Sequence, residues 1–105
     1  MSEKKFIAGL TKNALDQLTI LGENIRQARI ARQLSQEALA SRSLMSKATY
    51  VNVEKGDPNV SIGAYMAVLD LLDLLNGLED IAAPHKDEVG RRYRSLKSRK
   101  RPDHV

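Results

Sequence analysis

A chain of 105 residues is long enough for one compact core with extensions and too short for a two-lobed enzyme. It has 42% hydrophobic and 29% charged residues, no run of about 18 apolar residues, no signal-peptide core and no cysteine. These features predict a soluble cytoplasmic protein without a membrane span, a disulfide framework or a zinc finger. The net charge of +4 is modest evidence for a polyanionic partner.

The first predicted helix covers residues 21–33, where Leu21, Ile25 and Ala28 recur at helical spacing. Residues 1–20 form an N-terminal extension whose apolar residues also fit a helix. A helix within residues 1–20 either docks on the body or extends the helix at 21–33, and the sequence pattern leaves both arrangements open.

Two short helices follow, at about residues 36–41 and 47–55. Ser35 and Ser46 are suited to cap them, because a hydroxyl oxygen accepts a hydrogen bond from a free N–H of the first turn. Gly56 is suited to end the second of them. Two short helices joined by a tight bend form a helix-turn-helix, which indicates DNA binding.

Asp57-Pro58-Asn59 predicts a turn, and Ser61 is suited to cap a fourth helix that continues to about Leu75. The apolar residues of this helix cover more of its circumference than one small core requires. These residues are Ile62, Tyr65, Met66, Val68, Leu69, Leu71, Leu72 and Leu75. We interpret the surplus as a dimer surface. Asn76-Gly77 then ends the helix, and residues 78–82 form one further turn or short helix that completes the body.

The sequence therefore predicts an all-α protein with an N-terminal extension at 1–20, a helical DNA-binding and dimerisation domain at 21–83 and a basic tail at 84–105. Residues 57–85 carry a net charge of −5, whereas residues 86–105 carry +5. A dense positive charge with few large apolar residues favours a tail that stays disordered until a partner neutralises it.

The segments LGENIRQARIARQLSQEALA and SKATYVNVEKG resemble the helix-turn-helix of Cro/C1-type repressors, the XRE family, over residues 21–82. The resemblance implies five packed helices, the third entering the major groove and the second crossing the DNA backbone. It implies a fixed set of base-contacting positions, which are Lys47, Ala48, Val51 and Asn52. It also implies phosphate-contacting positions, which are Gln36, Ser46, Thr49 and Lys55. Lysine can donate to guanine and asparagine can pair with adenine, while small apolar residues contact the thymine methyl.

The resemblance further implies an ion pair between Arg29 and Glu54 that joins the first helix to the third. Plainer alternatives stay open for these positions: two independent surface charges at Arg29 and Glu54, a phosphate contact at Lys47, and simple packing at Ala48 and Val51. For Gln36 and Asn52 the alternative is a polar side chain on the helix surface that is hydrated and contacts no DNA. Ser46 is favoured as a helix cap over a phosphate ligand.

Three residues depart from the family pattern. Leu44 stands where the turn glycine is usual, Ser43 where an apolar core residue is usual, and Tyr50 where isoleucine or valine is usual. A leucine in a left-handed conformation costs roughly 1 kcal/mol or more. We therefore expect a modified turn, which either lengthens or moves Leu44 inward to replace the missing apolar side chain.

Beyond Gly56, the segments GDPNVSIG and DEVG resemble the HipB-like antitoxins. That resemblance implies a homodimer that represses its own operon and binds a HipA-like serine/threonine kinase toxin. A stand-alone phage-type or chromosomal repressor is the alternative. The basic tail residues are candidates to contact DNA phosphates or an acidic toxin surface, or to remain an unengaged solubilising tail. They are Arg91, Arg92, Arg94, Lys97, Arg99, Lys100 and Arg101.

The sequence gives no support for catalysis, a cofactor or a metal. His85 and His104 fall in the tail without neighbouring ligands, and there is no Gly-rich phosphate loop or paired-carboxylate motif. The expected partners are therefore double-stranded operator DNA, a second copy of the chain and the toxin.

Overall fold

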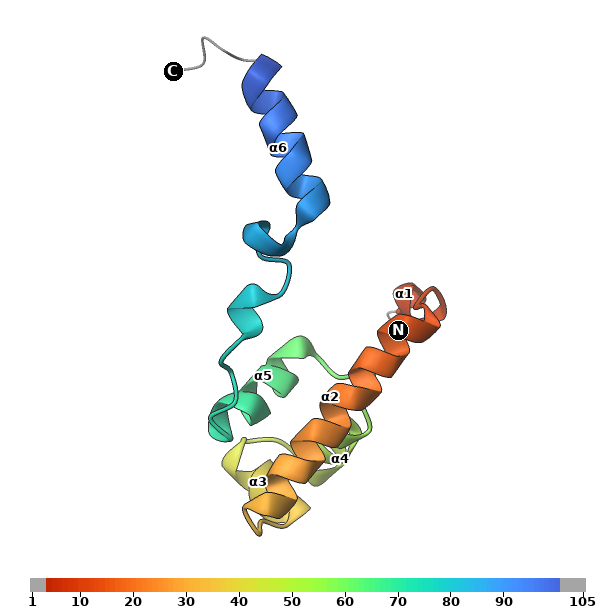
Figure 1. The fold of residues 1–105 in the computed structure, drawn as a ribbon. Helices are drawn as coiled ribbons and strands as arrows, with labels where there is room; N and C mark the ends of the chain where they lie inside the picture. The colour runs from red at the N-terminus through yellow and green to blue at the C-terminus, as the bar shows by residue number, and fades with distance from the viewer. Residues whose placement is uncertain (1–3, 101–105) are drawn as a thin grey trace. The chain divides into compact units, whose positions relative to one another are not determined.

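The computed structural model of the chain describes residues 4–100, with side chains through residue 97, and over that range it contains only helices and their connections (Figure 1). The all-α prediction is confirmed. The chain divides into two units, Met1–Leu74 and Leu75–Val105. None of the described helices is long and apolar enough to cross a membrane.

The first unit contains the helix-turn-helix. Its helices are α1 (Lys5–Ala8), α2 (Lys12–Ala31), α3 (Gln36–Arg42), α4 (Lys47–Glu54) and α5 (Ile62–Leu71). Helix α2 begins at Lys12 and not at Leu21, because Thr11 Oγ1 accepts a hydrogen bond from Ala14 N–H at 3.1 Å and caps it there. Residues 12–20 of the N-terminal extension therefore continue directly into the first helix of the body, while residues 5–8 form the separate short helix α1.

The predicted serine caps begin the next three helices. Ser35, Ser46 and Ser61 each accept, through Oγ, a hydrogen bond from the N–H three residues further on, at 3.0, 3.1 and 3.2 Å. Each serine is in an extended conformation, so that it turns the chain into the helix. These three predictions are confirmed.

Helices α2 to α5 all end in the same hydrogen-bonded turn. One residue after the C-cap has a positive φ, and its N–H and the next one bond back to carbonyls of the last helical turn. The residues with positive φ are Gln33, Leu44, Gly56 and Asp73. Three of the four turns therefore form without the glycine that usually accommodates this conformation.

The expectation of a modified turn at Leu44 is wrong. Leu44 keeps the left-handed conformation, with φ of 57°, and its side chain is 92% exposed and not turned inward. Two backbone hydrogen bonds hold the turn, from Leu44 N–H to Ser41 O at 3.1 Å and from Met45 N–H to Ala40 O at 3.0 Å. Ser43 remains half-buried, and its Oγ is buried without a hydrogen-bond partner among the described residues.

The core of the first unit lies where α2, α3, α4 and α5 meet. Its fully buried side chains are Ile25, Leu39, Tyr50, Val53 and Val68. Helix α4 packs against both α2 and α3. Burial of these side chains, each worth about 1.5–3 kcal/mol for an aliphatic residue, fixes the position of α4.

Helix α5 ends at Leu71, earlier than predicted. Asp73 takes a positive φ of 62°, and Leu74 N–H bonds back to Leu69 O at 2.8 Å. Arg32 Nη2 donates to the carbonyl oxygen of Leu72 at 2.9 Å, so this free end of α5 is satisfied by α2. The apolar run continues past the helix without extending it.

The second unit contains two short 3-10 turns and one helix. They are η1 (Leu78–Asp80), η2 (Pro84–Lys86) and α6 (Glu88–Lys100). The expectation of a tail without regular structure is therefore wrong for residues 88–100. Asp87 Oδ1 accepts from Gly90 N–H at 3.0 Å, which caps α6, and Glu88 in the first turn pairs with Arg91. These local signals outweigh the repulsion among the basic residues that follow.

Candidate nucleic-acid interface

Helix α4 presents one face to the core and another to solvent. Tyr50, Val53 and Glu54 are buried, whereas Lys47 and Ala48 are exposed. The other predicted contact positions in this helix, Thr49, Val51 and Asn52, are half-buried at the border between the two faces. The four predicted base-contacting side chains therefore lie on the side of α4 that does not face the core.

The first turn of α4 is closed by two hydroxyls. Ser46 Oγ accepts from Thr49 N–H at 3.1 Å and donates to Thr49 Oγ1 at 3.0 Å. Ser46 thus acts as the cap, the role favoured for it by the sequence. Thr49 Oγ1 keeps its own hydrogen as a donor, which suits a phosphate oxygen.

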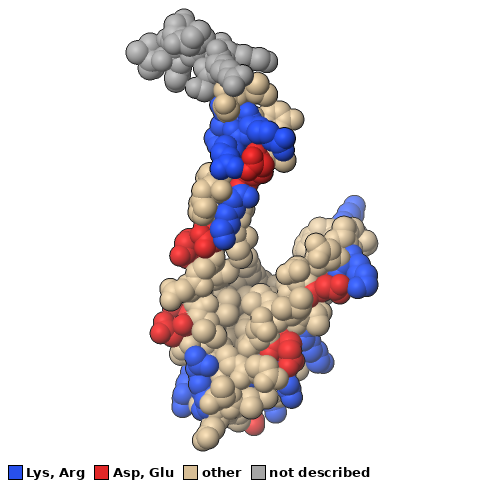
Figure 2. Space-filling model, viewed as in Figure 1, with Lys and Arg blue, Asp and Glu red and all other residues tan. Residues whose placement is uncertain are grey.

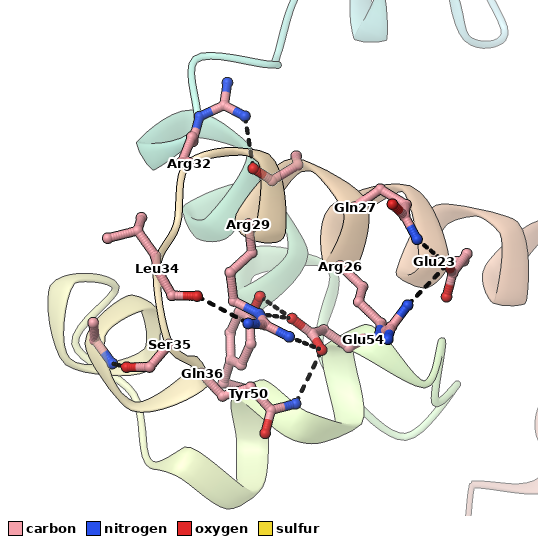
Figure 3. A network of polar contacts seen from close by, with 12 residues as sticks. Glu23, Arg26, Gln27, Arg29, Arg32, Leu34, Ser35, Gln36, Tyr50 and Glu54 are labelled. Atoms are coloured by element: carbon pink, nitrogen blue, oxygen red, sulfur yellow. Dashed lines mark hydrogen bonds and ion pairs between the residues drawn. The ribbon is translucent and has the colours of Figure 1, made fainter.

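The carboxylate of Glu54 accepts hydrogen bonds from three side chains (Figure 3). Arg29 Nε donates to Oε2 at 2.6 Å, and its Nη2 donates to Oε1 at 3.3 Å. Tyr50 Oη donates to Oε2, and Gln36 Nε2 donates to Oε1 at 3.0 Å. Arg29 Nη1 also donates to the carbonyl oxygen of Leu34 at 2.9 Å. One carboxylate therefore ties α2, α3 and α4 together.

The predicted pair of Arg29 and Glu54 is present and is not a pair of free surface charges. Their side chains are 12% and 5% exposed, so little water competes with the contact. Burial opposes ionisation of Glu54, but the hydrogen bonds from Arg29, Tyr50 and Gln36 outweigh it and lower the pKa of Glu54. The hydrogen bond to Glu54 raises the pKa of Arg29. The network is therefore charged under ordinary conditions.

The position of Tyr50 accounts for a tyrosine where the resemblance implies isoleucine or valine. The ring is fully buried in the core, as an isoleucine or valine would be, and its hydroxyl reaches Glu54. Burial, together with the hydrogen bond to Glu54, raises the pKa of Tyr50. Sequence reasoning missed this role. The signal was the spacing of four residues between Tyr50 and Glu54, which places both on one face of a helix.

Gln36, predicted to contact phosphate, is half-buried at the start of α3. One hydrogen of its amide is directed to Glu54, and the amide nitrogen carries a second one. The amide is thereby held at the N-terminus of α3, where the helix dipole also favours an anion.

Two glycines let α2 and α4 approach with no side chain between their backbones. A Cβ on Gly22 would lie 2.4 Å from the carbonyl oxygen of Glu54, and one on Gly56 would lie 2.3 Å from that of Leu18. Both contacts are with backbone, which cannot rotate away. Sequence reasoning recognised Gly56 as a helix stop but missed this packing role for both glycines.

The two lysines at the ends of α4 are exposed and available to contact an anion. Lys47 Nζ lies 3.9 Å from Glu37 Oε1, but both side chains are more than half exposed, so the pair is weak. Lys55, the C-cap of α4, is also exposed.

The predicted tail contacts other than Arg101 fall in α6. Arg91, Arg92, Arg94 and Lys97 are exposed, and Lys and Arg side chains crowd this segment in Figure 2. Arg94 Nη2 also donates to the carbonyl oxygen of Pro84 at 3.2 Å. The backbones of Arg99 and Lys100 belong to α6 but their side chains are outside the description, and Arg101 lies outside the described residues.

No group of three metal-binding side chains comes together within residues 4–97. The chain was also compared with known proteins. The family described as "Helix-turn-helix domain" matches residues 20–80, which is more than half of the chain and includes α3 and α4. No curated protein matches the chain.

Proposed function

The chain belongs to the helix-turn-helix domain family, and from that premise we propose that it is a sequence-specific transcriptional repressor that binds operator DNA as a homodimer. The observation that carries the proposal is the anchoring of α4. Its back is fixed by the Glu54 network while Lys47, Ala48, Val51 and Asn52 lie away from the core. A recognition helix held in one orientation places the same side-chain atoms in the major groove each time the protein binds, and sequence-specific recognition requires this.

The proposed contacts follow from the chemistry of these side chains. Lys47 donates to the acceptors of guanine, Asn52 pairs with adenine, and Ala48 and Val51 contact thymine methyl groups. Phosphate contacts come from residues around them, which set the register without reading sequence. These are Gln36, Ser46, Thr49 and Lys55.

The homodimer is supported by apolar residues that one chain leaves uncovered. Ile62, Leu71 and Leu74, in and just after α5, are 73%, 44% and 43% exposed. A dimer that places its two α4 helices about 34 Å apart would match two half-sites one DNA turn apart. Such an operator is a palindrome.

The test is a binding titration of the full chain on DNA from upstream of its own gene, beside random DNA of equal length. We expect preferential binding to one palindromic site, with an affinity that falls steeply with salt. Equal affinity for both DNAs at every salt concentration would refute sequence-specific recognition.

The finer proposal is that this repressor is a HipB-like antitoxin, and it is supported by the resemblance of GDPNVSIG and DEVG. In this chain the GDPNVSIG segment forms the entry to α5, where Asp57 Oδ1 accepts from Asn59 N–H at 2.8 Å and Ser61 caps the helix. Co-expression with the adjacent gene tests the proposal. A kinase-like product that co-purifies with the chain supports it, and the absence of any such neighbour favours a stand-alone repressor.

A further inference from the structure

The helix-turn-helix, residues 36–55, contains two carboxylates, Glu37 and Glu54. The side chain of Glu54 is 5% exposed and is paired with Arg29, whereas that of Glu37 is 75% exposed in the first turn of α3. Glu37 is therefore the one solvent-exposed carboxylate in a segment that is proposed to meet a polyanion. A carboxylate near phosphates opposes DNA binding, so Glu37 lowers the affinity for DNA unless another group compensates its charge.

A cation lies beside Glu37, and it is a proposed base-contacting residue. Lys47 Nζ, in the first turn of α4, is 3.9 Å from Glu37 Oε1. Helices α3 and α4 pack against each other, and Gln36 of α3 donates to Glu54 of α4, so the backbones that carry the pair are held together. The attraction is weak while water surrounds both side chains. Bound DNA displaces that water and strengthens the attraction, because the effective dielectric constant falls.

Lys47 has two kinds of acceptor in DNA, and Glu37 affects them differently. A phosphate oxygen bonded to Lys47 Nζ would lie within about 7 Å of Glu37 Oε1, since Nζ itself is 3.9 Å from that oxygen. Two negative charges at this separation repel each other, because salt at about 0.1 M screens charges only beyond roughly 10 Å. The N7 and O6 atoms of guanine are neutral acceptors, so a Lys47 that donates to them keeps Glu37 as its counter-ion. Glu37 therefore penalises the phosphate contact and spares the base contact.

We propose that Glu37 is a specificity-determining residue, which directs Lys47 to guanine and away from phosphate. This inference rests on the proposed function and names the residue that keeps Lys47 from a contact without sequence information. Every DNA offers phosphates to Lys47, whereas only the operator offers guanine in the right register. Glu37 then weakens binding to random DNA more than binding to the operator, and the ratio of the two affinities rises.

The test measures the affinity of the full chain for its operator, the palindrome upstream of its own gene, and for random DNA of equal length. Glu37→Gln keeps the size of the side chain and removes its charge. Affinity for random DNA should rise at least about threefold, and its logarithm should fall with log salt more steeply by about 0.9 for each copy bound, because Lys47 gains a phosphate. Affinity for the operator should change by less than about twofold, so that the specificity ratio falls.

Lys47→Met in both backgrounds shows whether Glu37 acts through Lys47. With Glu37 present, Lys47→Met should weaken operator binding at least about fivefold and change binding to random DNA by less than about twofold. In the Glu37→Gln background the same substitution should also weaken binding to random DNA and return its salt dependence to the wild-type slope. A steeper slope that persists without Lys47 would mean that Glu37 acts on DNA directly, and would overturn the proposal.

Asp16→Asn is the matched control. Asp16 Oδ2 lies 2.8 Å from Lys12 Nζ in an exposed pair on α2, outside the helix-turn-helix. The substitution removes the same charge as Glu37→Gln, and it should change the affinity for random DNA by less than about twofold. Equal gains in affinity for the two variants would assign the effect to net charge and refute the role of Glu37.

The remaining outcomes separate this proposal from the proposed function. A wild type that prefers no operator over random DNA refutes sequence-specific recognition itself. An operator preference that Glu37→Gln leaves unchanged refutes the role of Glu37 alone. If Glu37→Gln weakens operator binding and leaves random DNA unaffected, Glu37 itself accepts a hydrogen bond from a base, such as the amino group of cytosine, and the proposal fails.

Discussion

Helices α4 and α6 both carry basic side chains, but they are held in opposite ways. Helix α4 has three buried residues and is tied to two other helices through Glu54. Helix α6 has no buried side chain in its described part. Recognition of a base sequence needs side chains at fixed positions, and of these two helices α4 is the one that provides them. Helix α6 instead offers charge and apolar area, which find a partner without such fixed geometry.

Removing the carboxylate that anchors α4 should have the largest effect. Glu54→Ala leaves Arg29 nearly buried without its partner, and we expect a loss of about 3 kcal/mol in the free energy of unfolding. Urea denaturation measures it. Glu88→Ala, which removes the exposed partner of Arg91 in α6, should cost less than about 1 kcal/mol. Similar losses for both variants would erase the distinction between the two helices.

Adding a side chain where the backbones of α2 and α4 meet should have the next largest effect. Gly22→Ala places a methyl group against the backbone of Glu54, and we expect a loss of about 1–3 kcal/mol by urea denaturation. Gly63→Ala in α5 is the matched control, since its nearest contact is Ser61 Oγ at 3.8 Å. That variant should be neutral or stabilising by up to about 1 kcal/mol. A neutral Gly22→Ala would mean that the helices can separate without cost.

Substitutions in the two helices should affect DNA binding differently. Asn52→Ala should weaken operator binding by about 1–3 kcal/mol and leave binding to random DNA unchanged, as measured by titration on both DNAs. Asn13→Ala, at an exposed position of α2, is the matched control and should change neither. Arg94→Ala should weaken both DNAs alike if α6 meets phosphate. Equal losses on both DNAs for Asn52→Ala would contradict its reading role.

Acid should loosen α4 through Glu54. Its pKa is lower in the folded protein than in the unfolded chain, so its contribution to stability is complete above the ordinary carboxyl pKa of about 4.3. That contribution is lost as the pH falls through the lower, folded value. Urea denaturation from pH 6 to pH 3 should therefore show a steeper decline for the wild type than for Glu54→Gln. Parallel declines would assign the acid sensitivity to other carboxylates.

Relieving the turn before α4 should have the smallest effect. Leu44→Gly removes an exposed side chain from a left-handed residue, and we expect a gain of about 0.5–1 kcal/mol in thermal or urea denaturation. Leu44→Ala keeps the Cβ and should be nearly neutral. A stabilising alanine would show that the exposed leucine, and not the conformation, carries the cost.

The sequence was sufficient to predict features that depend on neighbours along the chain. Ser35, Ser46 and Ser61 cap helices as expected, because a cap needs only a hydroxyl and the three residues that follow it. The cap of α6 was equally local, at Asp87, but the surrounding charge concealed it.

The turn at Leu44 is local as well, but it was judged from the cost of its φ alone, without the backbone hydrogen bonds to Ala40 and Ser41 that hold it in place. Features that depend on distant residues were harder to predict. The hydrogen bond from Gln36 to Glu54 depends on the packing of α3 against α4, and it was missed. The resemblance supplied Arg29 and Glu54 because a family pattern records such distant contacts, which composition and periodicity do not.

The contact at Gly22 and Gly56 also bears on how this protein can be retargeted. The angle of α4 is fixed by backbone touching backbone and by side chains on its buried side, so the residues facing away from the core take no part in setting it. Under the proposed function, a library randomised at positions 47, 48, 51 and 52 would therefore vary the DNA sequence recognised while the orientation of α4 stays constant. Substitutions at these positions should then change DNA specificity with little change in the stability of the fold.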